Sequence, residues 1–148
     1  FVAWIDSPTD QVTGVAQQGQ ELFARLSKSN YVTVIAIDGT CVGGGAEMAV
    51  WCDRRIMTTA DKTSFAFPEV KLGLFPGWGG TARTPRMVGL FNAVELITAG
   101  DPIDAEAAKL MGLADDVVPT HPGLDSHDPR RAIRRPVPRR SPALVAAD

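Results

Sequence analysis

Residues 40–53 have the sequence TCVGGGAEMAVWCD. Three consecutive glycines, Gly43–Gly45, precede a short apolar segment that carries one carboxylate, Glu47. Glycine loses more backbone freedom on folding than any other residue. A glutamate, in turn, is almost never buried without a partner or a function. Both features of this segment therefore need a structural or a chemical reason.

The glycine run is compatible with three interpretations. A turn before a helix presents unpaired N–H groups at the positive helix end, where negative charge is stabilised. The first interpretation, a phosphate site, lacks the lysine and the hydroxyl of a P-loop. The second is an oxyanion hole for charge that develops on a carbonyl oxygen, with Glu47 about one turn away as a catalytic carboxylate. In the third, the glycines only permit tight packing and Glu47 is an N-terminal helix charge.

Composition bounds the class of protein. The chain has 148 residues, 45% hydrophobic content and a net charge of -2, which indicate one globular domain or part of one. This charge gives no general reason to expect nucleic acid or an anionic membrane as a partner. With two cysteines, no signal peptide and no long apolar span, we expect a reducing, cytoplasmic compartment. The chain opens with FVAWID and no initiator Met, so we expect it to be incomplete at its N-terminus.

Short strands and helices alternate along the first 120 residues, which predicts an α/β core. Apolar residues at helical spacing predict a helix over residues 9–28, and shorter helices are expected at about 45–52, 80–88, 91–99 and 104–111. Strands are expected at 31–37, 55–59, 64–67 and 116–118.

Residues 121–148 differ in character from the core over residues 1–120. They are rich in Pro and Arg and have little apolar periodicity, which predicts a tail or linker. Its arginines are compatible with contacts to RNA or to an acidic partner, although a solvated tail is favoured. Its Ser-His-Asp neighbours, residues 126–128, do not make a nucleophilic triad, because a triad is defined in space. Its two histidines do not predict a metal site.

A second motif follows the first. Residues 65–83 have the sequence FAFPEVKLGLFPGWGGTAR, in which Glu69 stands among apolar neighbours. Two carboxylates in an apolar setting allow an acid role and a base role to be separated, because burial and mutual repulsion raise one pKa. GWGGTA also matches a dinucleotide-binding pattern, but Pro68 and Pro76 interrupt the strand that should precede it.

Together these motifs resemble the enoyl-CoA hydratase/isomerase (crotonase) superfamily over residues 34–118. The matching segments are VIAIDGTCVGGGAEMAVWCD, SFAFPEVKLGLFPGWGGTARTPRMVG and AVELITAGDPIDAEAAKLMGLADDVV. The sequence of the second segment is most similar to hydratase domains of multifunctional fatty-acid oxidation proteins. The resemblance implies a spiral of β-β-α units, incomplete at both ends, that assembles as trimers or paired trimers.

The resemblance also implies a site for acyl-CoA thioesters. Two backbone N–H groups would stabilise the thioester enolate: that of Gly44, and that of Ile5 because FVAWID is similar to the F-x-A-G-x-D loop of the family. Trp4 stands where this loop has glycine. Gly77 and Trp78 are expected on the substrate side, and Phe67, Leu74 and Phe75 line either the acyl pocket or the core. Trp51 is expected in the core, and Cys41 as a small buried thiol rather than a nucleophile.

The implied reaction is hydration of a trans-2-enoyl-CoA. Glu47 would deprotonate the attacking water and Glu69 would deliver the α-proton. The alternatives are an enoyl-CoA isomerase, which needs one acid, and a truncated, non-catalytic domain that serves in assembly or RNA binding. No metal and no cofactor beyond the coenzyme A of the substrate is expected. Expected partners are further copies of the chain and further domains of a β-oxidation protein.

Overall fold

The computed structural model describes residues 8–120. Its elements in chain order are α2 (Thr9–Ser27), β1 (Val34–Ile37), β2 (Thr40–Val42), α3 (Gly44–Trp51), β3 (Arg54–Thr58), β4 (Ser64–Ala66), the 3-10 helix η1 (Pro68–Leu72), α4 (Gly80–Val88), α5 (Leu90–Ala99), α6 (Ala105–Leu110) and β5 (Asp116–Val118). No helix in this part of the chain has the length and apolar content to cross a membrane.

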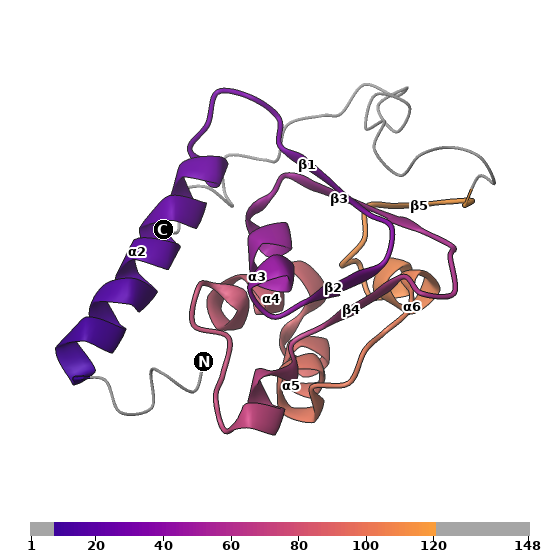
Figure 1. Cartoon of the computed structure of the whole chain (residues 1–148). Coiled ribbons are helices and arrows are strands. Elements are labelled where there is room, and N and C mark those ends of the chain that lie inside the picture. The colour runs from indigo at the N-terminus through magenta and orange to yellow at the C-terminus, as the bar shows by residue number, and fades with distance from the viewer. Residues whose placement is uncertain (1–7, 121–148) are drawn as a thin grey trace.

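The strands form two parallel ladders that follow from a repeated strand-strand-helix order. β1 and β2 lead into α3, β3 and β4 lead into η1 and α4, and the second repeat lies beside the first. β1, β3 and β5 therefore make one parallel sheet, in that order, while β2 and β4 make a second one (Figure 1). Parallel neighbours need a crossover between them, and α3 lies in the crossover of the pairs β1–β3 and β2–β4.

The core lies between these sheets and the helices α3, α5 and α6. Phe65 and Phe67 are fully buried and meet edge to face, with ring centroids 5.3 Å apart. Phe67 is therefore a core residue rather than a pocket residue. Leu74 and Phe75, the other two apolar candidates on this segment, are exposed.

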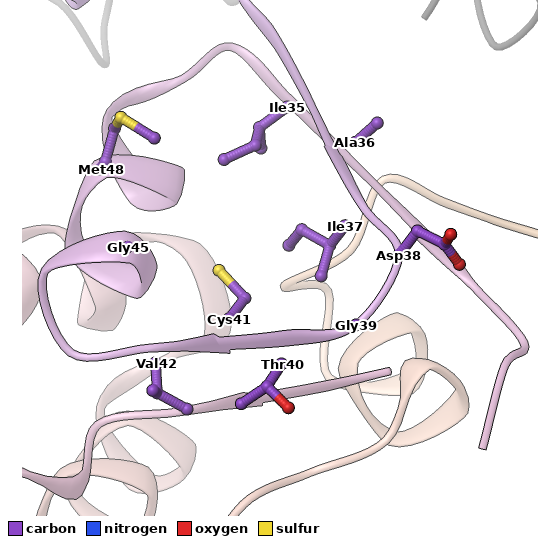
Figure 2. A pocket seen from close by; sticks show the side chains of 10 residues that line it. All are labelled: Ile35, Ala36, Ile37, Asp38, Gly39, Thr40, Cys41, Val42, Gly45 and Met48. Carbon is purple, nitrogen blue, oxygen red and sulfur yellow. The ribbon is translucent and has the colours of Figure 1, made fainter. Parts of the chain in front are cut away.

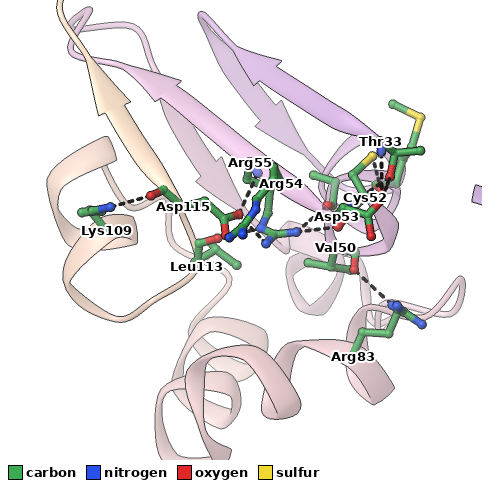
Figure 3. Close-up of polar contacts among 12 residues, drawn as sticks. Thr33, Val50, Cys52, Asp53, Arg54, Arg55, Arg83, Lys109, Leu113 and Asp115 are labelled. Atoms are coloured by element: carbon green, nitrogen blue, oxygen red, sulfur yellow. Dashed lines mark hydrogen bonds and ion pairs between the residues drawn. The ribbon is translucent and has the colours of Figure 1, made fainter. Parts of the chain in front are cut away.

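A buried arginine links β3 to the segment that precedes β5. Arg55 donates from Nε to the Leu113 carbonyl at 2.7 Å and from Nη2 to Asp115 at 2.6 Å (Figure 3). Its Nη1 donates to the Cys52 carbonyl at 2.8 Å, at the end of α3. Buried charges need such pairing and hydrogen bonding, so this network holds the crossover helix against the larger sheet.

Most of the expected elements occur within a few residues of their predicted bounds. Two elements were missed: β2, a strand within what was taken for the glycine loop, and η1, which carries Glu69. β1 begins at Val34 rather than at Tyr31, which is exposed. Ile5, Trp4 and the predicted tail lie outside the described residues.

Candidate active site

The glycine turn and Glu69 are neighbours because β2 and β4 are parallel. Val42 pairs with Ala66, so the chain leaves both strands at the same edge of their sheet. The Gly43 N–H donates to the Ala66 carbonyl at 3.3 Å. Gly43 has a φ of 56°, which favours glycine. A side chain there would place its Cβ 3.8 Å from Oε1 of Glu69, so the two loops face each other.

Glu47 lies in the first turn of α3 and is only 4% exposed, and its carboxylate is held by backbone groups at the start of a second helix, α4. Oε1 accepts hydrogen bonds from the N–H of Trp78 at 2.7 Å and of Gly80 at 3.0 Å. These donors stand at the N-terminus of α4, where backbone N–H groups stabilise an anion. Burial raises the pKa of Glu47, the two N–H groups lower it, and the charge of Glu69 raises it; burial dominates, so the pKa is raised overall.

Glu69 has a different environment. It lies in the first turn of η1, and burial raises its pKa also. Its Oε2 atom is buried without a hydrogen-bond partner among the described residues. Buried polar atoms without any partner are rare in proteins, and each needs an explanation. A water molecule or a ligand group that hydrogen-bonds to this oxygen would supply it.

The Trp78 indole covers the N-terminus of α3. A Cβ added to Gly44 would lie 2.8 Å from the ring, and one added to Gly19 of α2 would lie 2.5 Å from it. Phe23 meets the same ring edge to face, with centroids 5.7 Å apart. Gln20 also donates to the Gly77 carbonyl at 2.7 Å. Helix α2 therefore closes this side of the site through contacts with residues 77 and 78.

A separate hollow of about 330 Å³ lies between β1, β2 and the first turns of α3 (Figure 2). The Cys41 side chain points into it, whereas neither glutamate lines it. Burial raises the pKa of the Cys41 thiol to about 11, and the neighbouring Cys52 adds to the shift. A thiol with this pKa stays protonated near neutral pH and is a poor nucleophile.

Of the residues singled out in the sequence, Gly44, Glu47, Glu69 and Trp78 lie around one site, with Gly77 at its edge. Ile5 lies outside the described residues. Sequence reasoning missed three contributors to the site: Gly19, Gln20 and Gly80. Glycine at position 19 of an otherwise good helix was the one available signal for a close contact, since glycine weakens a helix interior.

Comparison with known proteins identifies the family of this chain. The family model described as enoyl-CoA hydratase/isomerase matches residues 5–134. The fatty acid oxidation complex subunit alpha of Vibrio campbellii is 48% identical over 115 residues, which are 78% of this chain and 16% of that protein. The subunit of the same name from Shewanella loihica is 45% identical over 105 residues, 71% of this chain and 15% of that protein.

Solved structures give the same assignment for the fold. The structure titled enoyl-CoA hydrates from Geobacillus kaustophilus has a TM-score of 0.74 and 31% identity, and covers 78% of this chain and 44% of its own. Enoyl-CoA hydratase from Bacillus anthracis has a TM-score of 0.71 and 34% identity, with the same coverage of 78% and 44%. The chain thus spans less than half of these structures and about one sixth of the relatives above. Its β-β-α spiral is the crotonase fold, and the chain belongs to the enoyl-CoA hydratase/isomerase family.

Proposed function

We propose that this chain carries the catalytic carboxylates of an enoyl-CoA hydratase, which converts trans-2-enoyl-CoA into 3-hydroxyacyl-CoA in fatty-acid β-oxidation. The observation that supports it most is the pair of glutamates at one site. Glu47 is fixed by two backbone donors, whereas a buried oxygen of Glu69 has no partner among the described residues. The names of the relatives, as fatty acid oxidation subunits, support the pathway.

The environments of the two carboxylates support different roles in this reaction. Hydrogen bonds to a carboxylate favour its charged form, so the two N–H donors suit Glu47 to act as the base. Burial raises the pKa of Glu69, and the opposing contribution comes from its own backbone N–H. A raised pKa keeps a carboxyl protonated to higher pH, which suits Glu69 to act as the acid.

The proposed reaction proceeds with a full balance of protons. Glu47 takes a proton from water while the water oxygen forms a bond to the β-carbon of the enoyl group. The electron pair of the double bond moves to the thioester oxygen as an enolate. The N–H of Gly44 and that of Ile5 would stabilise this oxygen. Glu69 then gives its proton to the α-carbon, which completes the 3-hydroxyacyl thioester.

A second candidate function is isomerisation of the enoyl double bond. One observation favours it: Oε1 of Glu47 already accepts two backbone hydrogen bonds. Glu47 would then be a structural ligand of the turn at residues 77–80, and Glu69 alone would carry the proton between the α- and γ-carbons. The two functions differ in which glutamates the reaction needs.

Glutamine substitutions separate these candidates. Under the hydratase proposal, Glu47→Gln and Glu69→Gln should each lower hydration of crotonyl-CoA by about 10²–10⁴, because glutamine keeps the shape but cannot exchange the proton. The double variant should be little worse than the worse single variant, since the two carboxylates act as a unit. Loss of enoyl absorbance measures hydration, and 3-enoyl-CoA isomerisation is followed in parallel.

Two results would contradict the hydratase proposal or favour the isomerase. Near-full hydration by either single variant would exclude the two-carboxylate mechanism. Isomerase activity that is lost in Glu69→Gln and kept in Glu47→Gln would support the second candidate. Cys41→Ala is a suitable control, because Cys41 lines the separate hollow and should leave both activities unchanged.

A further inference from the structure

Trp51 and Glu47 lie four residues apart on α3, so they share one face of this helix. Both side chains contact the same turn, residues 77–80, which the chain reaches only after β3, β4 and η1. Glu47 accepts hydrogen bonds from this turn, whereas Trp51 donates one to it: Nε1 of Trp51 lies 2.7 Å from the Trp78 carbonyl oxygen.

Three successive peptide groups of the turn form these hydrogen bonds, and they alternate between donating an N–H and accepting at a carbonyl. The peptide 77–78 donates its N–H to Glu47, and the peptide 79–80 donates its N–H to the same oxygen. The peptide between them, 78–79, instead presents its carbonyl to Trp51. Gly79 permits this arrangement with a φ of 118°. Fixing the middle peptide thereby fixes the direction of both N–H groups that reach Glu47.

The indole of Trp51 is itself held by two further contacts. A Cβ on Gly79 would come within 2.5 Å of Nε1, so the ring lies directly against the turn. The Arg83 guanidinium also lies 4.0 Å from the ring centroid, a distance suited to a cation–π contact. Nε of Arg83 donates to the Val50 carbonyl at 3.1 Å (Figure 3), and Trp51 and Arg83 are only 8% and 7% exposed.

We infer that Trp51 is a positioning residue: its indole ring is packed against Arg83, and its N–H orients the 77–80 turn so that two backbone N–H groups converge on Glu47. The inference rests on the proposed function of Glu47 as the base, and it assigns a task to a residue that the sequence placed in the core. Trp51 acts through the turn and is not itself a catalytic residue.

The groups that face Glu47 determine how this role is detected. Burial and the carboxylate of Glu69, from η1, raise its pKa, whereas the N–H groups of Trp78 and Gly80 lower it. Arg83, from α4, contacts the Trp51 ring and donates to the Val50 carbonyl. If the turn loses its anchor, the two N–H bonds weaken and the pKa of Glu47 rises further. A base acts only when it is deprotonated. If its pKa rises, activity therefore begins to fall at a higher pH as the solution is made more acidic.

The test is Trp51→Phe in the full chain, which keeps an aromatic ring under Arg83 but removes the N–H donor. We expect the pKa of Glu47, followed by NMR of ¹³C-labelled glutamate side chains, to rise by about half a unit or more. The acid limb of the pH profile for crotonyl-CoA hydration should move upward by the same amount. On that limb, hydration at a given pH should fall by about threefold or more, because a rise of half a unit in pKa lowers the deprotonated fraction of the base by about that factor.

Thr33→Val is the matched control, because it also removes a partly buried side-chain donor: the Thr33 hydroxyl, which hydrogen-bonds to Asp53. It should lower stability without moving the Glu47 titration. If Trp51→Phe does not fold, Trp51 is replaced by benzothienylalanine, which keeps the shape of indole and lacks the N–H. An unchanged pKa of Glu47 in the folded variant would overturn the inference. A shifted titration in a chain that never hydrates crotonyl-CoA would sink the proposed function and leave the positioning role intact.

Discussion

At the scale of single residues, Glu47 and Glu69 illustrate how identical side chains acquire different chemistry. Both are withdrawn from water, which raises the pKa of each. Only Glu47 receives two N–H groups from the start of another helix. Its charge is therefore stabilised by fixed donors, whereas the buried Oε2 of Glu69, which has no partner among the described residues, can accept a hydrogen bond from a ligand. A site that needs one base and one acid benefits from this asymmetry.

The three consecutive glycines are also not equivalent. Gly43 needs its positive φ, and a Cβ on Gly44 would lie 2.8 Å from the Trp78 ring. Gly19 and Phe23 of α2 also lie against this ring, so a shift of the ring away from position 44 would disturb α2. A Cβ on Gly45 would meet nothing within 4 Å. The run therefore contains two required glycines and one replaceable glycine, a distinction that its sequence does not reveal.

We expect Gly44→Ala to destabilise the chain by about 1–3 kcal/mol, the usual range for overpacking a filled site. Gly45→Ala is its matched control and should be neutral or stabilising by up to about 1 kcal/mol, because alanine favours helix over glycine. Urea unfolding of the two variants measures both effects. Equal losses of stability in the two variants would show that the Trp78 ring does not restrict position 44.

At the scale of elements, predictions succeeded where residues next to an element, such as flanking glycines, determine where it begins and ends. Helix α4 has its predicted bounds because Gly79 and Gly89 flank it, and both have positive φ. Strand β2 was missed because three residues between two glycines show no alternation. It is a strand because it pairs with β4, which is distant in sequence. η1 was missed because Pro68 and the chain reversal after β4 impose a single short helix without periodicity.

In the candidate site, too, some residues could be predicted from the sequence and others could not. The two glutamates were found because each stands out in an apolar motif, and the resemblance to a family linked them. The partners of Glu47 were not predicted, since the N–H groups of Trp78 and Gly80 meet its carboxylate only after the intervening strands have folded. Trp51 looked like an ordinary core residue for the same reason. Its hydrogen bond is visible only in three dimensions.

Helix α2 packs against α3 and against residues 77 and 78, and its attachment can be tested as a unit. Where burial is described along α2, no residue is fully buried. Its residues Gly19, Gln20 and Phe23 all contact residue 77 or residue 78. A helix attached in this way should open locally without unfolding the rest of the chain.

Gly19→Ala would place its Cβ 2.5 Å from the Trp78 indole, so we expect α2 to detach from it. Hydrogen exchange should then accelerate at the amides of α2 and stay unchanged in β1, α3 and β3. Gly14→Ala is the control on the same helix, because a Cβ there meets nothing within 4 Å. It should slow exchange in α2 or leave it unchanged. Equal exchange in both variants would mean that α2 does not rely on Trp78.

At the scale of the whole molecule, α5 presents apolar side chains to solvent. Leu90, Phe91 and Val94 are all exposed on this helix and border one hollow with Glu95. Contiguous apolar surface of this kind marks interaction sites in proteins. It supports the proposal, made first from the family resemblance, that the chain forms a homo-oligomer. Burial of this face between copies would remove its apolar side chains from water.

The oligomer proposal predicts that a charge at the centre of this face disrupts assembly. Phe91, 82% exposed, is replaced by Asp, because an unpaired carboxylate is costly to bury in an interface. Tyr31→Asp is the control, since Tyr31 is equally exposed, at 82%, and lies outside the helices and strands. Light scattering should give an oligomer for the parent chain and for Tyr31→Asp, and a smaller species for Phe91→Asp. The Tm of the parent should also rise with chain concentration, because association stabilises the folded state by mass action. A parent chain that is monomeric at every concentration, with a constant Tm, would show that α5 is not a self-association surface in this chain.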